Sequence, residues 1–238
     1  MTNASSLSIK VFADGADIAG IRKLADDPMI AGITTNPTLM RKVGIEDYEQ
    51  FATELLEVVP DRPISFEVFS DDFAEMERQA LKIAGWGENV YVKVPITNTE
   101  GTSSLDLVRR LSHEGVKLNV TALMTGAQVE GSAAALEGGA PAFVSVFAGR
   151  IADAGVDPLP IMVAALDSLR PLADVELIWA SPREVLNIVQ ADQIGCHIIT
   201  VTHDLLAKLH LLGRDLDEFS LDTVRMFHQD ASAAGFTL

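Results

Sequence analysis

The sequence is short of three features that would point to other classes of protein. It has one cysteine, Cys196, so no disulfide can form within the chain, and this is compatible with a reducing cytoplasm, where we expect the protein to act. Lys and Arg number 18 against 34 Asp and Glu, a net charge of −16 with no long basic run, and we therefore expect neither nucleic acids nor anionic membranes as partners. No apolar stretch approaches the roughly 18 residues of a membrane span. The first residues lack the basic and then apolar pattern of a signal peptide, so we expect none.

The residues that are present suit a protein with a sizeable core. Hydrophobic residues account for 48% of the 238 residues and charged residues for 22%, which are ordinary values for a folded globular chain. Eight short apolar runs, many of them β-branched, predict β-strands. They cover residues 9–14, 32–36, 64–69, 90–95, 117–123, 143–147, 176–180 and 197–202.

Helical patterns separate the predicted strands. They cover residues 17–25, 48–59, 71–84, 104–111, 126–136, 160–169, 183–191 and 205–212. Alternating strands and helices predict parallel β-α units, and eight of them in a chain of this length favour a closed (β/α)8 barrel, the TIM barrel of the α/β class. A doubly wound open sheet is the alternative. No linker divides the chain, so we expect a single barrel domain over residues 1–238, with an extra C-terminal helix over residues 221–234.

Lys93 stands out within these strands. It lies in the run Val-Tyr-Val-Lys-Val-Pro, residues 90–95, which is apolar on both sides of the lysine and predicts a strand buried on both faces. Burial disfavours the charged form of a lysine, and the neutral amine is a nucleophile that can condense with a carbonyl to form a Schiff base. The alternative is a lysine near a strand end whose ammonium group reaches solvent or pairs with a carboxylate.

Polar residues gather where the predicted strands end. In a TIM barrel the C-terminal ends of the strands form one rim, and this rim carries the active site. Each polar residue has an ordinary explanation by itself, as a helix cap, a turn residue or half of a surface ion pair. Together they place carboxylates, a lysine, asparagines and arginines around one rim, and this predicts a site. The set comprises Asp14, Thr35, Asn36, Glu67, Lys93, Asn119, Thr121, Ser145, Arg150, Ser181 and Arg183.

The histidines do not predict a metal site. His197, His203 and His210 lie close in sequence to Cys196, but their spacing matches no known set of ligands. The sequence also lacks a Walker A motif and a Gly-x-Gly-x-x-Gly motif after a strand. We therefore expect no metal and no nucleotide cofactor.

Five segments carry a resemblance to a known family. Two are specific, namely Gly-Ile-Thr-Thr-Asn-Pro-Thr-Leu at residues 32–39 and Val-Lys-Val-Pro-Ile-Thr at residues 92–97. Three support them, namely Leu-Asn-Val-Thr at 118–121, Ser-Val-Phe-Ala-Gly-Arg at 145–150 and Ala-Ser-Pro-Arg at 180–183. With these segments the chain resembles, over nearly its whole length, the transaldolase family, and in particular its short members related to the fructose-6-phosphate aldolases.

The resemblance implies a role for each matching residue. Lys93 matches the Schiff-base lysine, and Asp14 matches the acid–base residue on the first strand. Glu67 matches a carboxylate that works through a water, which Thr121 helps to position. The implied substrate-binding residues are Thr35, Asn36, Asn119, Ser145 and Phe147, and the implied phosphate-binding residues are Arg150, Ser181 and Arg183.

The activity that the resemblance implies is that of a class I transaldolase of the pentose phosphate pathway. Such an enzyme transfers a dihydroxyacetone unit from fructose 6-phosphate or sedoheptulose 7-phosphate to an aldose phosphate, and it needs no cofactor. The alternative is an aldolase that releases dihydroxyacetone, but the related aldolases carry glutamine in place of Glu67 and tyrosine in place of Phe147. Gly15, Val146 and Pro182 depart from the family pattern and leave the sugar open, so an enzyme of specialised sugar biosynthesis is a further alternative. The non-enzymatic alternative is a barrel that only binds sugar phosphates.

The resemblance also concerns assembly. The short relatives form pentameric rings that pair into decamers, with the last helix crossing to a neighbouring subunit. We therefore expect a homo-oligomer, a pentamer or a decamer, in which residues 221–234 serve as that helix.

Overall fold

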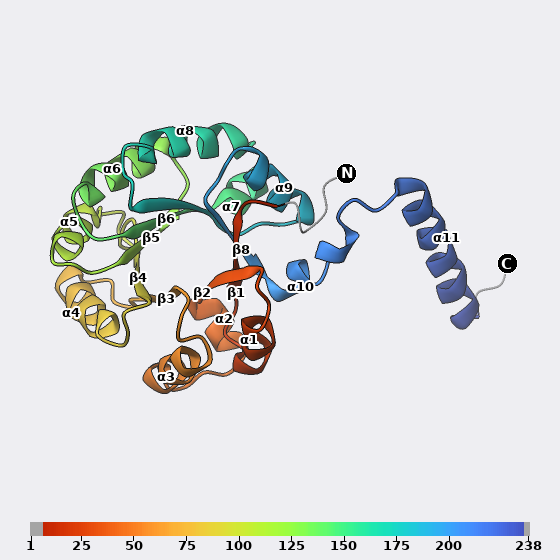
Figure 1. Cartoon of the computed structure of the whole chain (residues 1–238), viewed down its shortest axis with the longest axis horizontal. Helices are drawn as coiled ribbons and strands as arrows, with labels where there is room; N and C mark the ends of the chain where they lie inside the picture. The colour runs from red at the N-terminus through yellow and green to blue at the C-terminus, as the bar shows by residue number, and fades with distance from the viewer. Residues whose placement is uncertain (1–6, 236–238) are drawn as a thin grey trace.

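The eight predicted strands are all present and close into a parallel barrel (Figure 1). The structure is a computed structural model that describes residues 7–235; the predicted domain's ends, residues 1–6 and 236–238, lie outside the described part. Pairing of the first strand with the eighth closes the ring, so the alternative of an open sheet is wrong. The strands are β1 (Lys10–Asp14), β2 (Ile30–Thr34), β3 (Ile64–Glu67), β4 (Val90–Pro95), β5 (Leu118–Leu123), β6 (Ala142–Val146), β7 (Val175–Trp179) and β8 (Ile198–Thr202).

Helices cover the outside of the barrel, as the alternating pattern predicts (Figure 1). Seven of the predicted helices are present with shifts of a few residues at their ends. The structure adds two short helices after β2 and β6, whose six residues are too few to give a periodic signal. The elements are α1 (Ile18–Ala25), α2 (Pro37–Lys42), α3 (Tyr48–Val58), α4 (Phe73–Ala84), α5 (Leu105–His113), α6 (Gly126–Leu136), α7 (Ala148–Asp153), α8 (Leu159–Leu169), α9 (Val185–Gln193), α10 (His203–Leu206), the 3-10 helix η2 (Leu209–Leu211) and α11 (Leu216–Ala233).

The single helix predicted over residues 205–212 is wrong. The segment instead forms the four-residue helix α10 followed by η2. Backbone bonds tighten there to a three-residue spacing, because Lys208 N–H donates to the Leu205 carbonyl and Leu211 N–H donates to the Lys208 carbonyl. The apolar spacing still buries Leu205 and Leu209, so the sequence pattern does not distinguish the two backbone forms.

An aromatic layer fills the lower half of the barrel interior. Phe12 and Phe143 meet edge to face with ring centroids 5.6 Å apart, and Ile178 and Ile198 pack around them. Gly32 faces Phe12 so closely that a Cβ atom at this glycine would lie 2.6 Å from the ring. This layer closes the interior from below, so the polar side chains above it open only towards the C-terminal rim.

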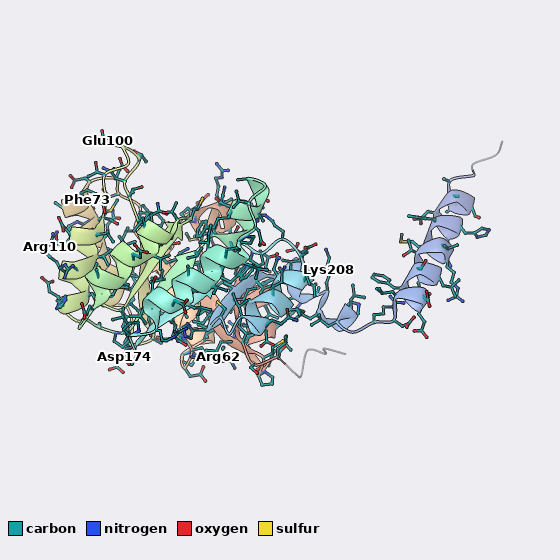
Figure 2. All side chains as sticks on the ribbon, turned by 90° about the horizontal axis from the view of Figure 1, so that it is seen from above. Arg62, Phe73, Glu100, Arg110, Asp174 and Lys208 are labelled. Carbon is teal, nitrogen blue, oxygen red and sulfur yellow. The ribbon has the colours of Figure 1, made fainter. Side chains whose placement is uncertain are left out.

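The helix α11 stands away from the barrel, and Figure 2 shows it separated from the body of the chain. None of its residues is buried, and it exposes Leu216, Val224 and Phe227. It begins at Leu216, earlier than predicted, because the Asp215 carboxylate accepts the N–H groups of the first turn. Within residues 7–235, no helix combines the length and the apolar character needed to cross a bilayer.

Candidate active site

Side chains that point into the barrel form two layers along the strands. Because successive residues of a strand alternate between its faces, the residue two positions after each lower-layer residue belongs to the upper layer. Phe12 is thus followed by Asp14, Tyr91 by Lys93 and Phe143 by Ser145. The upper layer is polar, and its members line a cavity of about 500 Å³ at the C-terminal rim.

Lys93 sits at the centre of this polar layer. Its neighbours in the barrel register are Glu67 on β3 and Asn119 on β5, so the three residues form one row. Nζ of Lys93 lies 3.2 Å from Oε2 of Glu67 and donates a hydrogen bond of 2.8 Å to the Thr35 carbonyl. Only 6% of the lysine is exposed, so the amine is held in place and shielded while it still faces the cavity.

Asp14 enters the same cavity from β1. Oδ1 of Asp14 accepts a hydrogen bond of 2.9 Å from the Thr34 hydroxyl, which also contacts the Thr200 hydroxyl. Oδ2 of Asp14 lies 3.4 Å from Nδ2 of Asn36. Burial raises the pKa of the Asp14 carboxyl, and attraction to Lys93 and the hydrogen bonds offset this only in part. A carboxyl whose pKa is moved towards neutrality suits proton transfer in both directions.

Strands β3, β5 and β6 carry a chain of neutral polar groups. The Ser145 hydroxyl donates to Oδ1 of Asn119 at 2.7 Å, and Nδ2 of Asn119 donates to Oγ of Ser65 at 3.0 Å, which fixes the amide orientation. Beside them, Oγ1 of Thr121 is buried without a hydrogen-bond partner among the described residues. The backbone turns into the left-handed region at Ala122, with φ 66°, where the register between β5 and β6 shifts. This irregularity changes the direction of the backbone where β5 ends at the cavity wall.

Two arginines line the cavity from the segments that follow β6 and β7. Arg150 lies on α7, and Arg183 follows β7. Asp153 holds the Arg183 guanidinium, with Nε of Arg183 2.9 Å and 3.1 Å from the two carboxylate oxygens. Nη1 of Arg183 donates to Oγ of Ser181 at 3.1 Å. These groups present guanidinium and hydroxyl donors on one side of the cavity, as binding of a phosphate requires.

The structure brings together all but one of the residues predicted for the site. The exception is Thr35, which is fully buried, does not line the cavity, and donates its hydroxyl to the Ser65 carbonyl. What Thr35 gives to the site is its backbone carbonyl, which accepts a hydrogen bond from the Lys93 amine. The predicted residues that line the cavity are Asp14, Asn36, Glu67, Lys93, Asn119, Thr121, Ser145, Phe147, Arg150, Ser181 and Arg183.

Several further lining residues were not among those predicted, and they include the polar residues Thr34, Lys42 and Thr200. Thr34 and Thr200 face inward beside Asp14, and Lys42 reaches the cavity from α2. Thr200 lies two positions after Ile198 of the lower layer, and this two-residue period of β8 could have indicated it. Lys42 gives no such signal, because its approach depends on a short helix that the sequence pattern does not predict.

A larger cavity, of about 640 Å³, lies at the opposite, N-terminal face of the barrel. Its lysine and its arginine are paired with carboxylates, Lys10 with Glu176 at 2.7 Å and Arg170 with Asp167. It contains no lysine shielded from solvent comparable to Lys93. Within residues 7–235, no three His, Cys, Asp or Glu side chains converge in a way that would hold a metal ion.

We expect Gly149→Ala to disrupt the end of the cavity where Arg150, Ser181 and Arg183 are predicted to bind a phosphate. A Cβ atom at this position would lie 1.5 Å from the Ser181 carbonyl oxygen, and the Ser181 backbone is already left-handed, with φ 62°. The added methyl group therefore displaces Ser181 and the Arg183 side chain bonded to it. Steady-state kinetics should give a KM for phosphorylated sugars that is higher by about tenfold or more, a loss of about 1.4 kcal/mol in binding, with a smaller change for unphosphorylated ones.

Gly126→Ala is the matched control for this variant. Gly126 also lies in the first turn of a helix, and no atom would meet its added Cβ within 4 Å. An unchanged KM in Gly149→Ala, with the fold intact by circular dichroism, would contradict the assignment of this end of the cavity.

The fold and the rim together define a class, a TIM barrel with a shielded lysine and carboxylates at the C-terminal ends of its strands. The family model described as transaldolase/fructose-6-phosphate aldolase matches residues 11–238. The chain belongs to this family.

Named relatives agree with the family. A probable transaldolase from Dehalococcoides mccartyi is 37% identical over 202 residues, which cover 84% of this chain and 90% of the relative. A probable transaldolase from Streptococcus equi subsp. zooepidemicus is 36% identical over 206 residues, with the same shares covered. The chain is thus an enzyme of the aldolase and transaldolase type.

A solved structure supports the architecture alone. A truncated 3-deoxy-D-arabino-heptulosonate 7-phosphate synthase from Thermotoga maritima superposes with a TM-score of 0.53, covering 96% of this chain and 88% of that one. Its sequence identity is only 13%, so the likeness concerns the barrel and not the chemistry.

Proposed function

We propose that the protein is a class I transaldolase that transfers a dihydroxyacetone unit between sugar phosphates through a Schiff base on Lys93. The observation that carries the proposal is the shielded Lys93 amine, 3.2 Å from the Glu67 carboxylate, in a cavity that it shares with Asp14. A nucleophilic amine with two carboxylates of different surroundings is the arrangement that covalent carbonyl chemistry requires.

The first step forms the covalent link. The lone pair of the Lys93 amine attacks C2 of the ketose phosphate, the nitrogen gives up a proton, and the carbonyl oxygen takes one up to give a carbinolamine. Loss of this hydroxyl as water leaves a protonated imine. Glu67 serves as the proton shuttle through a water, since its carboxylate lies beside Nζ, and the buried hydroxyl of Thr121 offers that water a partner.

The second step breaks the carbon chain. Asp14 takes the proton of the C4 hydroxyl, the C4–O bond becomes a carbonyl, and the electron pair of the C3–C4 bond moves into the imine to give an enamine. An aldose phosphate leaves, and the dihydroxyacetone unit stays on Lys93. Because burial raises its pKa, the Asp14 carboxylate is suited to accept this proton and to return it when the acceptor aldehyde arrives.

The remaining side chains orient the sugar. Asn36, Asn119 and Ser145 line the cavity and would bond the hydroxyls of the dihydroxyacetone unit. The Asn119 amide is held by hydrogen bonds to Ser65 and Ser145. Arg150, Arg183 and Ser181 would bind the phosphate at the other end of the cavity. No organic cofactor takes part in these steps.

Trapping the intermediate tests the proposal. The protein is incubated with fructose 6-phosphate, reduced with borohydride and digested, and we expect mass spectrometry to find a dihydroxyacetone-sized adduct on Lys93. Addition of erythrose 4-phosphate should then yield sedoheptulose 7-phosphate with little free dihydroxyacetone. Free dihydroxyacetone as the main product would favour the aldolase instead. No adduct with any ketose phosphate would leave a barrel that only binds sugar phosphates, and an adduct only with other ketoses would point to specialised sugar biosynthesis.

We expect Glu67→Gln to slow transfer by about 10²-fold, because positioned proton transfer contributes 10²–10⁴-fold and an amide cannot shuttle protons. The share of free dihydroxyacetone among the products should rise, since glutamine is the residue of the related aldolases. Both quantities are measured with coupled assays, and Glu100→Gln, at an exposed loop position, is the control. Full transfer activity in Glu67→Gln would refute the role given to this carboxylate.

We further propose that α11 packs against another copy of the chain in a homo-oligomer, a pentamer or a decamer. The support is that an 18-residue helix with Leu216, Val224 and Phe227 exposed buries nothing within its own chain. Exposed apolar faces of this size usually meet a partner.

A further inference from the structure

Two threonines flank Asp14 inside the barrel. Thr34 is the partner of Asp14 in the register between β1 and β2, and Thr200 lies on β8, on the other side of β1. Both threonines are buried, and both line the cavity. Because β8 pairs with β1 to close the barrel, the two hydroxyls meet next to the Asp14 carboxyl.

The hydrogen bonds among these three groups run in one direction. An ionised carboxylate can only accept hydrogen bonds, so the Thr34 hydroxyl uses its one proton to donate to Oδ1 of Asp14, at 2.9 Å. The Thr34 oxygen also contacts the Thr200 hydroxyl, which must then be the donor in that second bond. The chain therefore runs from Thr200 to Thr34 to Oδ1 of Asp14, and each bond in such a chain strengthens the next.

The other oxygen of Asp14 is much less occupied. Among the described residues it accepts a hydrogen bond only from Nδ2 of Asn36, and at 3.4 Å this bond is longer than a normal one. The Asn36 amide has a fixed orientation, because its own Oδ1 accepts the Leu39 N–H and caps α2. Oδ2 of Asp14 thus keeps the lone pairs that an incoming proton needs.

We propose that Thr34 and Thr200 are positioning residues, which hold Oδ1 of Asp14 and leave Oδ2 to take the proton of the C4 hydroxyl. A donated hydrogen bond favours the ionised form of the oxygen that accepts it, so the oxygen with the weaker bond is the better base. The bond to Thr34 also fixes the rotation of the carboxyl group, which keeps Oδ2 in one direction within the cavity. In cleavage the proton moves from the C4 oxygen to Oδ2, and after the acceptor aldehyde adds it moves from Oδ2 to the new hydroxyl oxygen. The role rests on the proposed function of Asp14 as the acid–base group.

The charged groups around Asp14 do not hold its oxygens in this way. Lys93 faces the carboxyl across the cavity and is itself paired with Glu67 at 3.2 Å, and His203 follows β8. Within residues 7–235, none of these three side chains makes a hydrogen bond to Asp14. Burial raises the pKa of Asp14, while attraction to Lys93 and the hydrogen bonds to the carboxyl oppose the increase. Loss of the Thr34 hydroxyl would therefore remove the short hydrogen bond to Asp14 and leave the surrounding charges in place.

Titration of Asp14 tests the part played by Thr34. The ¹³Cγ resonance of Asp14, assigned with the Asp14→Asn variant, is followed against pH without substrate in the wild-type protein and in Thr34→Val. We expect the midpoint to move to higher pH in Thr34→Val, because the hydrogen bond that favours the ionised form is gone. The acid limb of the kcat/KM profile should move in the same direction, and Thr34→Ser, which keeps the hydroxyl, should restore both. A midpoint that stays or falls in folded Thr34→Val, or a Thr34→Ser protein that behaves like Thr34→Val, overturns the proposal.

Thr200→Val tests the direction of the chain. Loss of this hydroxyl should move the Asp14 midpoint to higher pH by a smaller amount, and it should add no further shift in a Thr34→Val background, because it acts through Thr34. Thr202→Val is the matched control, since it removes a hydroxyl of the same strand that bonds Asp204 and does not line the cavity. We expect the control to leave the midpoint unchanged. Additive shifts from the two threonines would contradict the chain.

A crystal structure tests the choice of oxygen. Crystals of Asp14→Asn are soaked with fructose 6-phosphate to hold the intact ketose on Lys93, and the C4 oxygen should lie within hydrogen-bond distance of the atom at the Oδ2 position. A C4 oxygen bonded to the atom at the Oδ1 position, or to neither atom, overturns the assignment. The titrations need no turnover, so they stand apart from a failure of the wild-type protein to form the Lys93 adduct, which would overturn the proposed function instead.

Discussion

Lys93→Arg forms no reducible adduct with fructose 6-phosphate and shows no transfer above background, if the proposed chemistry is correct. Arginine preserves the positive charge opposite Glu67, but a guanidinium is not a usable nucleophile near neutral pH. The loss should therefore be complete and not graded, because the covalent step has no substitute within this site. Borohydride trapping with mass spectrometry and a coupled transfer assay measure the two effects.

Lys42 provides a demanding control for this result. It is the other lysine that lines the cavity, so Lys42→Arg tests whether any nearby amine suffices. We expect the Lys42→Arg protein to keep the adduct on Lys93. An adduct in the Lys93→Arg protein, on Lys42 or elsewhere, would contradict the assignment of the nucleophile.

Asp14→Asn lowers kcat/KM by about 10²–10⁴-fold, the range expected for loss of a positioned proton-transfer group. Schiff-base formation on Lys93 should continue, because Asp14 acts at the C4 hydroxyl and not at the amine. Rapid-quench trapping then shows an adduct of intact ketose phosphate that does not cleave. An enamine that forms at the wild-type rate in Asp14→Asn would exclude Asp14 as the base.

The same variant should be more stable than the wild-type protein at neutral pH. Burial raises the folded-state pKa of Asp14 above its unfolded value, so the ionised group lowers the free energy of unfolding once the pH rises above that unfolded value. Asparagine removes the cost, and Tm at pH 7 should increase. The difference should shrink as the pH falls below about 4, where the unfolded-state carboxyl is also protonated. Equal Tm values for the wild-type protein and Asp14→Asn, both at pH 7 and below about pH 4, would mean that burial of the ionised Asp14 carboxylate does not destabilise the fold.

The sequence predicted the barrel and the centre of the site for a physical reason. Strands buried on both faces give apolar runs, so a lysine inside one of them is conspicuous, and the two-residue period of a strand decides which side chains share a layer. Lys93, Glu67 and Asn119 could be placed together because parallel strands end at one rim. These relationships need only the order of the elements.

Contacts that depend on closure or on short helices could not be predicted in this way. His203 meets Gly15 because β8 pairs with β1, and Arg183, in the loop after β7, meets Asp153 at the end of α7. Lys42 reaches the cavity from a helix too short to produce a pattern. The side chain of Thr35 was predicted for substrate binding, but strand alternation turns it towards the Ser65 carbonyl. The cytoplasmic location, the pathway and the pentamer or decamer depend on properties beyond one chain and stay predictions.

The left-handed backbone of Ala122 and Ser181 has a consequence for how a ligand would bind. They are the two non-glycine residues of the 7–235 range with this conformation, and both line the cavity. Such conformations cost about 1–3 kcal/mol each and persist only when surrounding contacts enforce them. The cost is met when the chain folds, so the rim is preorganised and an arriving sugar phosphate loses less affinity to ordering the protein. A variant in which these two residues left the left-handed region would have a more stable fold but a lower affinity for the substrate.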